Sequence, residues 1–283
     1  MNLAIRKKQI TNKYADLHLH TNFSDGILSP EQIVLKAKCR GLSAIAITDH
    51  DTIDAIDPAI EAGKKYNLEI IPGIELSAET DTGEFHILGF YINWCNKDLI
   101  RKIDELKESR RIRLIQMIDR LSDIGIKLEY ETVLKKSNSA SIGRPHLASA
   151  LVESGYVSTI SEAFYKFLNN NSPIYIAKQK LYPSAARQLI LNANGIPVLA
   201  HPAYLQTNIL EELVSFGLMG LEAFHPCLDI QISNYYCELA KKYELLITGG
   251  SDYHGCKRSN LPRTFLSAVS RTEHVLSINI SAS

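Results

Sequence analysis

The sequence predicts an α/β protein in which about seven strands, joined by helices, close into a barrel that carries a helical insert. Short apolar runs alternate with amphipathic stretches along most of the 283 residues. Residues 96–180 break that alternation with mainly helical sequence. A histidine or a carboxylate ends nearly every predicted strand, and a barrel brings all of those ends to one mouth.

The first half of the chain supplies four predicted strands and two helices. Alternating or apolar runs place the strands at residues 14–20, 43–50, 69–77 and 84–92. Ser29 and Pro30 begin the first helix and Gly41 ends it, whereas residues 52–67 form the second. The turn-forming residues 81–83 join the third and fourth strands.

The pattern resumes after the insert. Helices at residues 183–195, 208–217 and 229–243 alternate with strands at residues 196–201, 220–225 and 245–252. Strands joined by helical crossovers pair in parallel, so we expect parallel strands.

The insert begins with a long amphipathic stretch, residues 98–124. One stripe of it is apolar: Leu99, Ile103, Leu106, Leu114, Met117, Ile118 and Leu121. Further helical sequence follows at residues 144–154 and 160–168. We therefore divide the chain into a barrel domain, residues 1–95 and 181–283, and a helical lid subdomain, residues 96–180, over one end of the barrel.

The composition excludes several classes of protein. The 31 basic and 31 acidic side chains leave no net charge, which argues against a protein that coats polyanions but permits a local basic pocket. No apolar run approaches the roughly 18 residues that span a bilayer, and the polar N-terminus does not resemble a signal peptide. The five scattered cysteines form no CxxC pair, so we expect reduced thiols and a cytoplasmic protein with no membrane contact or obligate protein partner.

Nine residues at predicted strand ends form a candidate metal site. His18 and His20 lie two apart in a strand and therefore point to the same face. The full set is His18, His20, Asp25, His50, Glu75, His86, His201, Asp252 and His254. Six imidazoles and three carboxylates exceed the ligands of one ion, so we expect two to three divalent ions. The set holds no thiolate, and we expect manganese, with iron or zinc as alternatives.

Six motifs resemble, in order, the PHP (polymerase and histidinol phosphatase) domain: HLHTNFSDG from residue 18, ITDHD from 47, PGIELS from 72, FHILG from 85, LAHP from 199 and GGSDYHG from 249. The resemblance implies a distorted (β/α)7 barrel with a trinuclear metal centre. It would place His18, His20, Glu75 and Asp252 on one ion, Glu75, His86 and His201 on a second, and Asp25, His50 and His254 on a third.

The insert carries IGRPHLA at residues 142–148, which resembles the PHP branch that removes the 3′-phosphate of 3′,5′-bisphosphonucleotides and includes RNase AM-type 5′→3′ exoribonucleases. We therefore expect a metal-dependent phosphoesterase of such nucleotides, and trimming of short RNA from the 5′ end stays open as a further activity. A phosphorylated nucleotide or an RNA 5′ end is the expected partner. The chain departs from the family pattern after Pro202, because Ala203 and Tyr204 stand where a basic residue is usual.

The expected mechanism is attack of a metal-activated water on phosphorus. Asp252 belongs to the catalytic set, and His225 or His201 would protonate the leaving hydroxyl group. Asp49 and Asp51 would orient the ligand histidines.

Selectivity would come from a cationic clamp in the insert. Arg144 precedes Pro145 at the start of a predicted helix, where free N–H groups and the helix dipole favour an anion. Its guanidinium would hold a second phosphate through two hydrogen bonds, and a solvated surface arginine is the alternative. The expected substrate-binding set is Arg144, His146, Lys178, Asp25 and His50.

Two other functions fit part of the pattern. A histidinol-phosphate-type phosphatase would share the metal residues, but the helical insert and its GRPH segment argue against it. A non-catalytic nucleic-acid-binding PHP module would keep the fold alone, yet burying so many ionisable groups without metal is costly.

Overall fold

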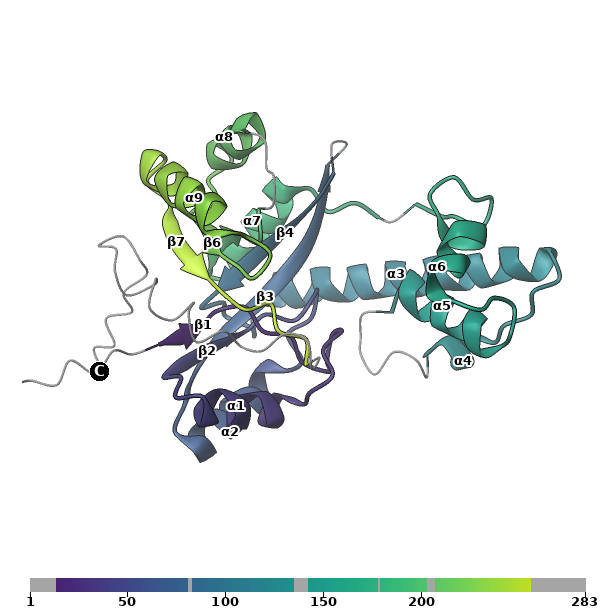
Figure 1. Ribbon diagram of the computed structural model, residues 1–283, viewed down its shortest axis with the longest axis horizontal. Coiled ribbons are helices and arrows are strands. Elements are labelled where there is room, and N and C mark those ends of the chain that lie inside the picture. The colour runs from purple at the N-terminus through teal and green to yellow at the C-terminus, as the bar shows by residue number, and fades with distance from the viewer. Residues whose placement is uncertain (1–13, 81–82, 135–141, 178, 203–206, 256–283) are drawn as a thin grey trace, which may run out of the picture.

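The fold is seen in a computed structural model, which describes residues 14–80, 83–134, 142–177, 179–202 and 207–255 (Figure 1). Lys178, Ala203 and Tyr204, which the sequence singled out, lie outside these described residues. None of the described helices is long and apolar enough to cross a membrane.

Seven strands form one sheet in chain order: β1 Ala15–Asp16, β2 Ala44–Ile47, β3 Glu69–Thr80, β4 Gly83–Phe90, β5 Ile196–Leu199, β6 Gly220–Phe224 and β7 Leu246–Gly249. The last strand returns to the first, because the Leu17 N–H donates to the Gly249 carbonyl at 3.4 Å and Leu19 bridges Tyr253 in parallel. The sheet is therefore a nearly closed barrel, which confirms the predicted fold class.

The strand β4 departs from the expected parallel arrangement. It pairs antiparallel with β3, from Gly73 opposite Phe90 to Thr80 opposite Gly83, and antiparallel with β5 as well. Only two residues separate β3 from β4, and so short a connection permits only this direction, whereas a parallel pair needs a long crossover. The beginning of β4 therefore lies at the mouth of the barrel. His86 is at the mouth because it is early in β4 and not at the end of the strand.

Five helices cover the barrel: α1 Pro30–Cys39, α2 Ile56–Tyr66, α7 Pro183–Asn192, α8 Thr207–Ser215 and α9 Ile230–Lys242 (Figure 1). The predicted start of α1 is confirmed, because the Ser29 side chain accepts the Gln32 N–H while the Gln32 side chain accepts the Ser29 N–H. The loops that follow the strands therefore form the walls of the mouth of the barrel.

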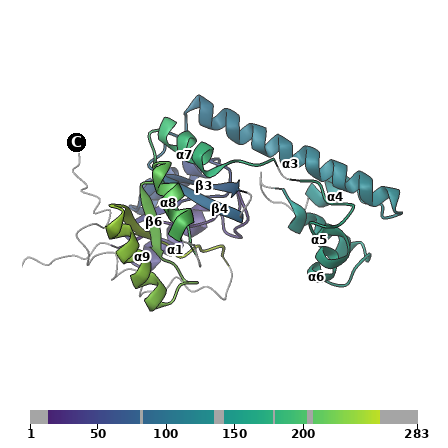
Figure 2. The ribbon, with the colours of Figure 1, turned by 90° about the horizontal axis from the view of Figure 1, so that it is seen from above.

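The long helix α3, Lys97–Asp123, runs from the barrel to the insert helices (Figure 2), and its side chains belong to two hydrophobic cores. Leu99, Ile103 and Leu106 pack in the barrel core. The rest of its apolar stripe packs with the insert helices α4 Tyr130–Leu134, α5 Arg144–Glu153, α6 Ile160–Ala163 and the π-helix η1 Phe164–Leu168. All seven predicted stripe residues are buried, so one helix face anchors both parts of the chain.

The backbone of Gly250, which follows β7, lies against His18. A Cβ atom at Gly250 would approach the His18 nitrogen to 2.7 Å, closer than real Cβ atoms come to such an atom. We expect Gly250→Ala to lower the free energy of unfolding by about 1–3 kcal/mol, because the added methyl group overpacks the seam of the barrel. Urea unfolding measures this loss.

Gly143→Ala is the matched control, because its nearest new contact is ordinary, 3.7 Å from Pro145 Cδ. We expect it to cost less than about 1 kcal/mol, the effect of a poorer helix cap. Equal losses for the two variants would show that the close approach at Gly250 is unimportant.

Candidate metal centre

The strand β1 and the loop after it present the first site residues. His18 and His20 are both fully buried, with ring centroids 5.1 Å apart. Asp49 accepts hydrogen bonds from the Thr21 N–H and hydroxyl, both at 2.7 Å, and from the hydroxyl of Ser24. Asp49 thus fixes the loop that leads to Asp25. Among the described residues, Asp49 forms no hydrogen bond with a histidine, and its predicted role of orienting one stays a prediction.

Glu75, in the middle of β3, is the point at which the other side chains converge. It is fully buried, and its two oxygens face ring nitrogens of five histidines. One oxygen lies 3.1 Å from His18 Nε2, His20 Nε2 and His50 Nδ1, and the other lies 2.9 Å from His86 Nδ1 and 3.1 Å from His201 Nε2. Residues separated by up to 183 positions in the chain therefore meet around one carboxylate.

Four groups of side chains among the described residues place their donor atoms within 4.8 Å of one another, as a metal ion requires: His20, Asp25, His50 and His254; His18, Glu75 and His201; His18, His20 and Asp252; and His50, Glu75 and His86. All nine predicted residues are in these groups. The division differs from the expected one, because Glu75 meets His201 and His86 in separate groups and His20 joins the group around Asp25.

Three buried nitrogens show that this cluster fits metal ions. Both ring nitrogens of His20 and Nδ1 of His50 form no hydrogen bond of regular geometry among the described residues, although His20 Nε2 and His50 Nδ1 each lie 3.1 Å from a Glu75 oxygen. An unpartnered polar atom in the interior is costly, and a lone pair aimed at a cation removes that cost. Nitrogen and carboxylate donors without thiolate suit manganese, iron or zinc. The assignment of each residue to a particular ion stays a prediction.

The electrostatics of the cluster follow from burial and close opposite charges. Burial alone would raise the pKa of Glu75, but the surrounding histidines outweigh it and hold that pKa well below its usual range. Burial would lower the pKa of His20, but the carboxylates of Asp252 and Glu75 raise it to about 9. His50 differs, because burial dominates and lowers its pKa to about 4. Without metal, the cluster therefore holds protons on some histidines at neutral pH.

Sequence reasoning missed Glu222, a buried carboxylate in the middle of β6. Its Oε1 lies 3.0 Å from His18 Nδ1, and its Oε2 accepts the His201 N–H at 2.7 Å. The signal was present, since a glutamate within an otherwise apolar strand needs a partner in the interior. Glu222, and not Asp49 or Asp51, is the carboxylate that contacts the far side of a ligand histidine.

Asp51 links the loop beside the metal cluster to the insert. It has a positive φ of 48° and accepts the Ser77 N–H at 2.9 Å. It also forms a salt bridge with Arg110 of α3. Asp51 thus joins the insert helix to the loop beside His50, whereas the expectation that it orients a histidine stays a prediction.

One cavity of about 840 Å³ joins the metal cluster to the insert. Asp25, His50 and His86 line one side of it. The insert contributes a basic and aromatic wall: Arg110, Arg113, Arg144, His146 and Tyr175. The predicted clamp residues Arg144 and His146 therefore share a cavity with predicted metal ligands.

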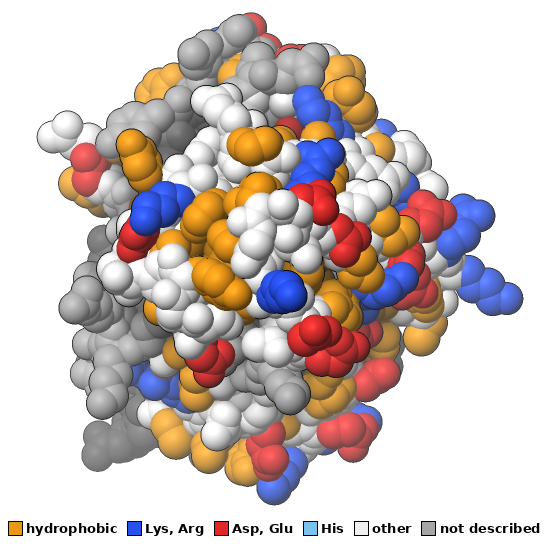
Figure 3. All heavy atoms as spheres, turned by 90° about the vertical axis from the view of Figure 1, so that its right-hand side faces the viewer, with side chains coloured by type: hydrophobic (Ala, Val, Ile, Leu, Met, Phe, Trp, Pro, Cys, Tyr) orange, Lys and Arg blue, Asp and Glu red, His pale blue; other side chains and the backbone are white. Residues whose placement is uncertain are grey.

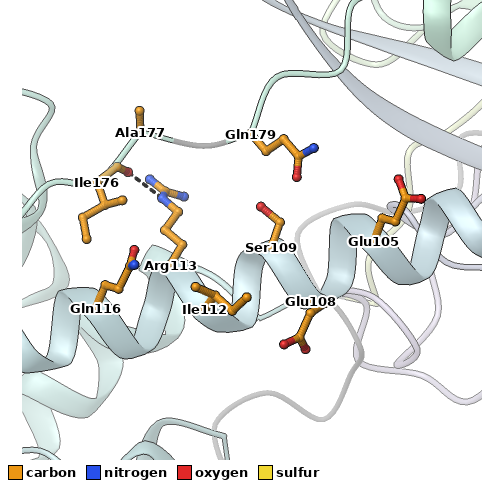
Figure 4. Close-up of a pocket in the computed structure, with 9 residues that line it drawn as sticks. All are labelled: Glu105, Glu108, Ser109, Ile112, Arg113, Gln116, Ile176, Ala177 and Gln179. Carbon is orange, nitrogen blue, oxygen red and sulfur yellow. Dashed lines mark hydrogen bonds between the residues drawn. The ribbon is translucent and has the colours of Figure 1, made fainter.

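The two arginines of this wall that form no salt bridge are held in place by neutral partners. Arg144 donates to the Leu168 carbonyl at 2.9 Å and to Asn170 Oδ1 at 2.8 Å. Arg113 Nε donates to the Ile176 carbonyl at 2.6 Å (Figure 4). Among the described residues, no carboxylate lies within 4.0 Å of either guanidinium, and both lie over the ring of Tyr175 at 5.3–5.4 Å. Sequence reasoning missed Arg113, because it reads as part of the solvated face of α3.

The outer end of the insert differs from this basic wall. On the face shown in Figure 3, basic side chains are interspersed with acidic and apolar ones. The described residues on this face thus form no continuous basic surface of the kind that binds nucleic acid without sequence preference.

Fold and site together define an α/β barrel whose mouth carries a histidine- and carboxylate-rich cluster able to bind divalent metals. Residues 16–190 match the PHP domain. The chain belongs to the PHP domain family, as the sequence motifs predicted.

Three curated proteins illustrate its relatives. A phosphoribosyl 1,2-cyclic phosphate 1,2-diphosphodiesterase of Eggerthella lenta is 33% identical over 85% of this chain and 94% of that protein. A 5′-3′ exoribonuclease of Haemophilus influenzae is 30% identical over 87% of this chain and 91% of its own. A 3′,5′-nucleoside bisphosphate phosphatase of Chromobacterium violaceum is 28% identical over 84% of this chain and 86% of its own.

Two solved structures share the whole fold. A candidate metal-dependent phosphoesterase of Bifidobacterium adolescentis has a TM-score of 0.76 and 31% identity, covering 90% of this chain and 92% of its own. An amidohydrolase of Chromobacterium violaceum, solved with sulfate and without metal, has a TM-score of 0.74 and 26% identity, covering 88% and 92%.

Metal binding is expected to release protons. His20 is protonated at pH 7 in the metal-free protein, since its pKa is about 9, and a metal ion must displace that proton. We expect Mn²⁺ binding at pH 7 to release about one proton or more per chain, and the apparent affinity to rise with pH up to about 9. Titration calorimetry in two buffers of different ionisation enthalpy counts the protons. Equal heats in both buffers would contradict this account of His20.

Proposed function

We propose that the protein is a metal-dependent phosphoesterase that removes the 3′-phosphate of 3′,5′-bisphosphonucleotides. The observation that carries the proposal is the single cavity that has predicted metal ligands on one side and the Arg113–Arg144 wall on the other. A substrate with two phosphates has one to react and one to be held. The predicted metal ligands suit the phosphate that reacts, and the arginine wall suits the negative charge of the phosphate that is held.

The chain's own residues would divide the work as follows. Glu75 and the histidines around it would hold the ions, which supply an activated water and neutralise charge on the phosphoryl oxygens when bound. Arg144 and Arg113 would hold the second phosphate, since guanidinium groups that lack a carboxylate partner favour an anion. His146 accepts the Gly143 N–H at Nδ1, so its proton sits on Nε2 and can be donated to a substrate oxygen. Burial lowers the pKa of His146 and keeps it neutral.

His225 and His201, the predicted proton donors, are not among the residues that line the cavity, and His225 is buried. His201 Nε2 faces Glu75 at 3.1 Å, which suits a ligand. His225 accepts the Cys227 N–H at Nδ1, so its Nε2 carries the proton and faces Asp252 Oδ2 at 3.3 Å. We propose that His225 holds Asp252 so that its Oδ1, 3.1 Å from His20 Nε2, points into the cluster.

The relatives support a phosphorylated ribose as the substrate class. Their names state a phosphoribosyl cyclic phosphate, RNA and a nucleoside bisphosphate as the molecules on which they act. Trimming of short RNA from its 5′ end is the second candidate activity, favoured by the exoribonuclease relatives and by the open cavity. Histidinol phosphate carries one phosphate only and would leave the arginine wall unused. A non-catalytic binding module would have no use for nine convergent donor groups.

Phosphate release from adenosine 3′,5′-bisphosphate with added Mn²⁺ tests the proposal directly. We expect turnover that chelation abolishes and that His20→Ala, a change in the ligand cluster, also abolishes. The 3′-phosphate should be the one released, leaving the 5′-monophosphate. Turnover of histidinol phosphate or of a ribose cyclic phosphate, with none of the bisphosphate, would refute the assigned substrate.

The clamp is tested by Arg144→Ala and Arg113→Ala. Each variant loses a charged hydrogen-bond donor to the second phosphate, so we expect the KM for the bisphosphate to rise about tenfold to a hundredfold. The kinetics with p-nitrophenyl phosphate, which has one phosphate, should change little. Arg111→Ala is the matched control, because Arg111 lies on the same helix but pairs with Glu108 at the surface. An unchanged KM in both clamp variants would disprove the clamp.

A further inference from the structure

We propose that Glu222 is a positioning residue that sets the affinity of one metal ion by orienting His18 and His201 together. These two histidines and Glu75 form one of the four ligand groups. The inference rests on the metal centre of the proposed function and is independent of the substrate.

The contacts of Glu222 link distant parts of the barrel. Its side chain is 1% exposed, so the carboxylate has little access to water and depends on protein donors. It extends from β6 to His18, which follows β1, although β7 lies between these two strands in the barrel. Its second oxygen receives the His201 N–H at 2.7 Å, just after β5. One carboxylate thus connects the residues that follow two separate strands.

The contact with His18 selects the state of the ring that can bind a metal ion. A carboxylate only accepts, so the His18 proton must sit on Nδ1, 3.0 Å from Glu222 Oε1. The other nitrogen, Nε2, lies 3.1 Å from Glu75 and 3.4 Å from Asp252, and it is therefore the nitrogen left to bind an ion together with those carboxylates. Without this acceptor, the proton is free to occupy Nε2 and block it.

The contact with His201 acts on the backbone. His201 has a φ of 24°, a conformation that residues with a side chain rarely adopt. Its N–H bond to Glu222 stabilises that conformation, which directs Nε2 to Glu75 at 3.1 Å. Among the described residues, Glu222 forms no hydrogen bond or ion pair with Asp25, His50 or His254, so its influence is confined to one side of the cluster.

Glu222→Gln tests this role with little change in shape. Glutamine keeps one acceptor oxygen and turns an NH₂ group toward a donor, so it cannot satisfy both His18 and His201. We expect the dissociation constant of one Mn²⁺ ion to rise about tenfold to a hundredfold while the other ions bind as in the wild type. Chelator competition and elemental analysis of the whole protein measure this, and turnover should recover when Mn²⁺ is raised.

Thr248→Val is the matched control. Thr248 pairs with Glu222 in the sheet, is 1% exposed, and its hydroxyl oxygen lacks a partner among the described residues. We expect this variant to bind every ion as the wild type does. The proposal is overturned if Glu222→Gln binds all ions normally, if all ions weaken together, or if Thr248→Val weakens the same ion.

A shorter variant covers the case in which Glu222→Gln does not fold. Glu222→Asp keeps two acceptor oxygens but withdraws them by one methylene, so we expect a smaller loss at the same ion, and no loss would overturn the proposal. Ion binding is measured without substrate. A wild type that binds Mn²⁺ but releases no phosphate from the bisphosphate would therefore refute the proposed substrate and leave the role of Glu222 standing.

Discussion

The carboxylate of Glu75 lies 2.9–3.1 Å from ring nitrogens of five histidines that come from β4 and from the segments after β1, β2 and β5. A buried negative charge is tolerated only when positive or polar groups surround it. The fold must therefore bring these segments to one point, and a nearly closed barrel does so. The cluster is also held from behind, because Asp49, Asp51 and Glu222 each fix a loop or a ring that approaches Glu75.

Much of this arrangement could be predicted from local sequence, because strand periodicity and strand-end residues are local signals. The nine clustered residues, the apolar stripe of α3 and the cap of α1 were all visible in this way. The direction of β4 was implicit in the short connection that the sequence places at residues 81–83, but the helical crossovers elsewhere in the chain obscured it. Physical rules on connection length would have corrected the expectation.

What the sequence could not supply was the partner of each polar group. Asp49 and Asp51 stand beside His50 in the chain, yet their hydrogen bonds go to Thr21, Ser24 and Ser77, which are distant in sequence. In the sequence, Arg113 is one of several arginines on a solvated helix face. It is enclosed only because residues 174–177 fold back alongside α3. Such contacts depend on how the chain folds back, and a single sequence does not record that.

The helix α3 runs without interruption from the barrel core to the core of the insert. A continuous α-helix has a fixed rise of about 1.5 Å per residue, so Arg113 stands at a set distance from the base that Leu99 and Ile103 anchor. Within the proposed function the helix acts as a ruler. A molecule contacts both walls only when the distance between its two anionic groups matches the distance that α3 sets, and a shorter molecule leaves one wall empty. Inserting one helical turn would therefore lengthen the substrate that the cavity selects.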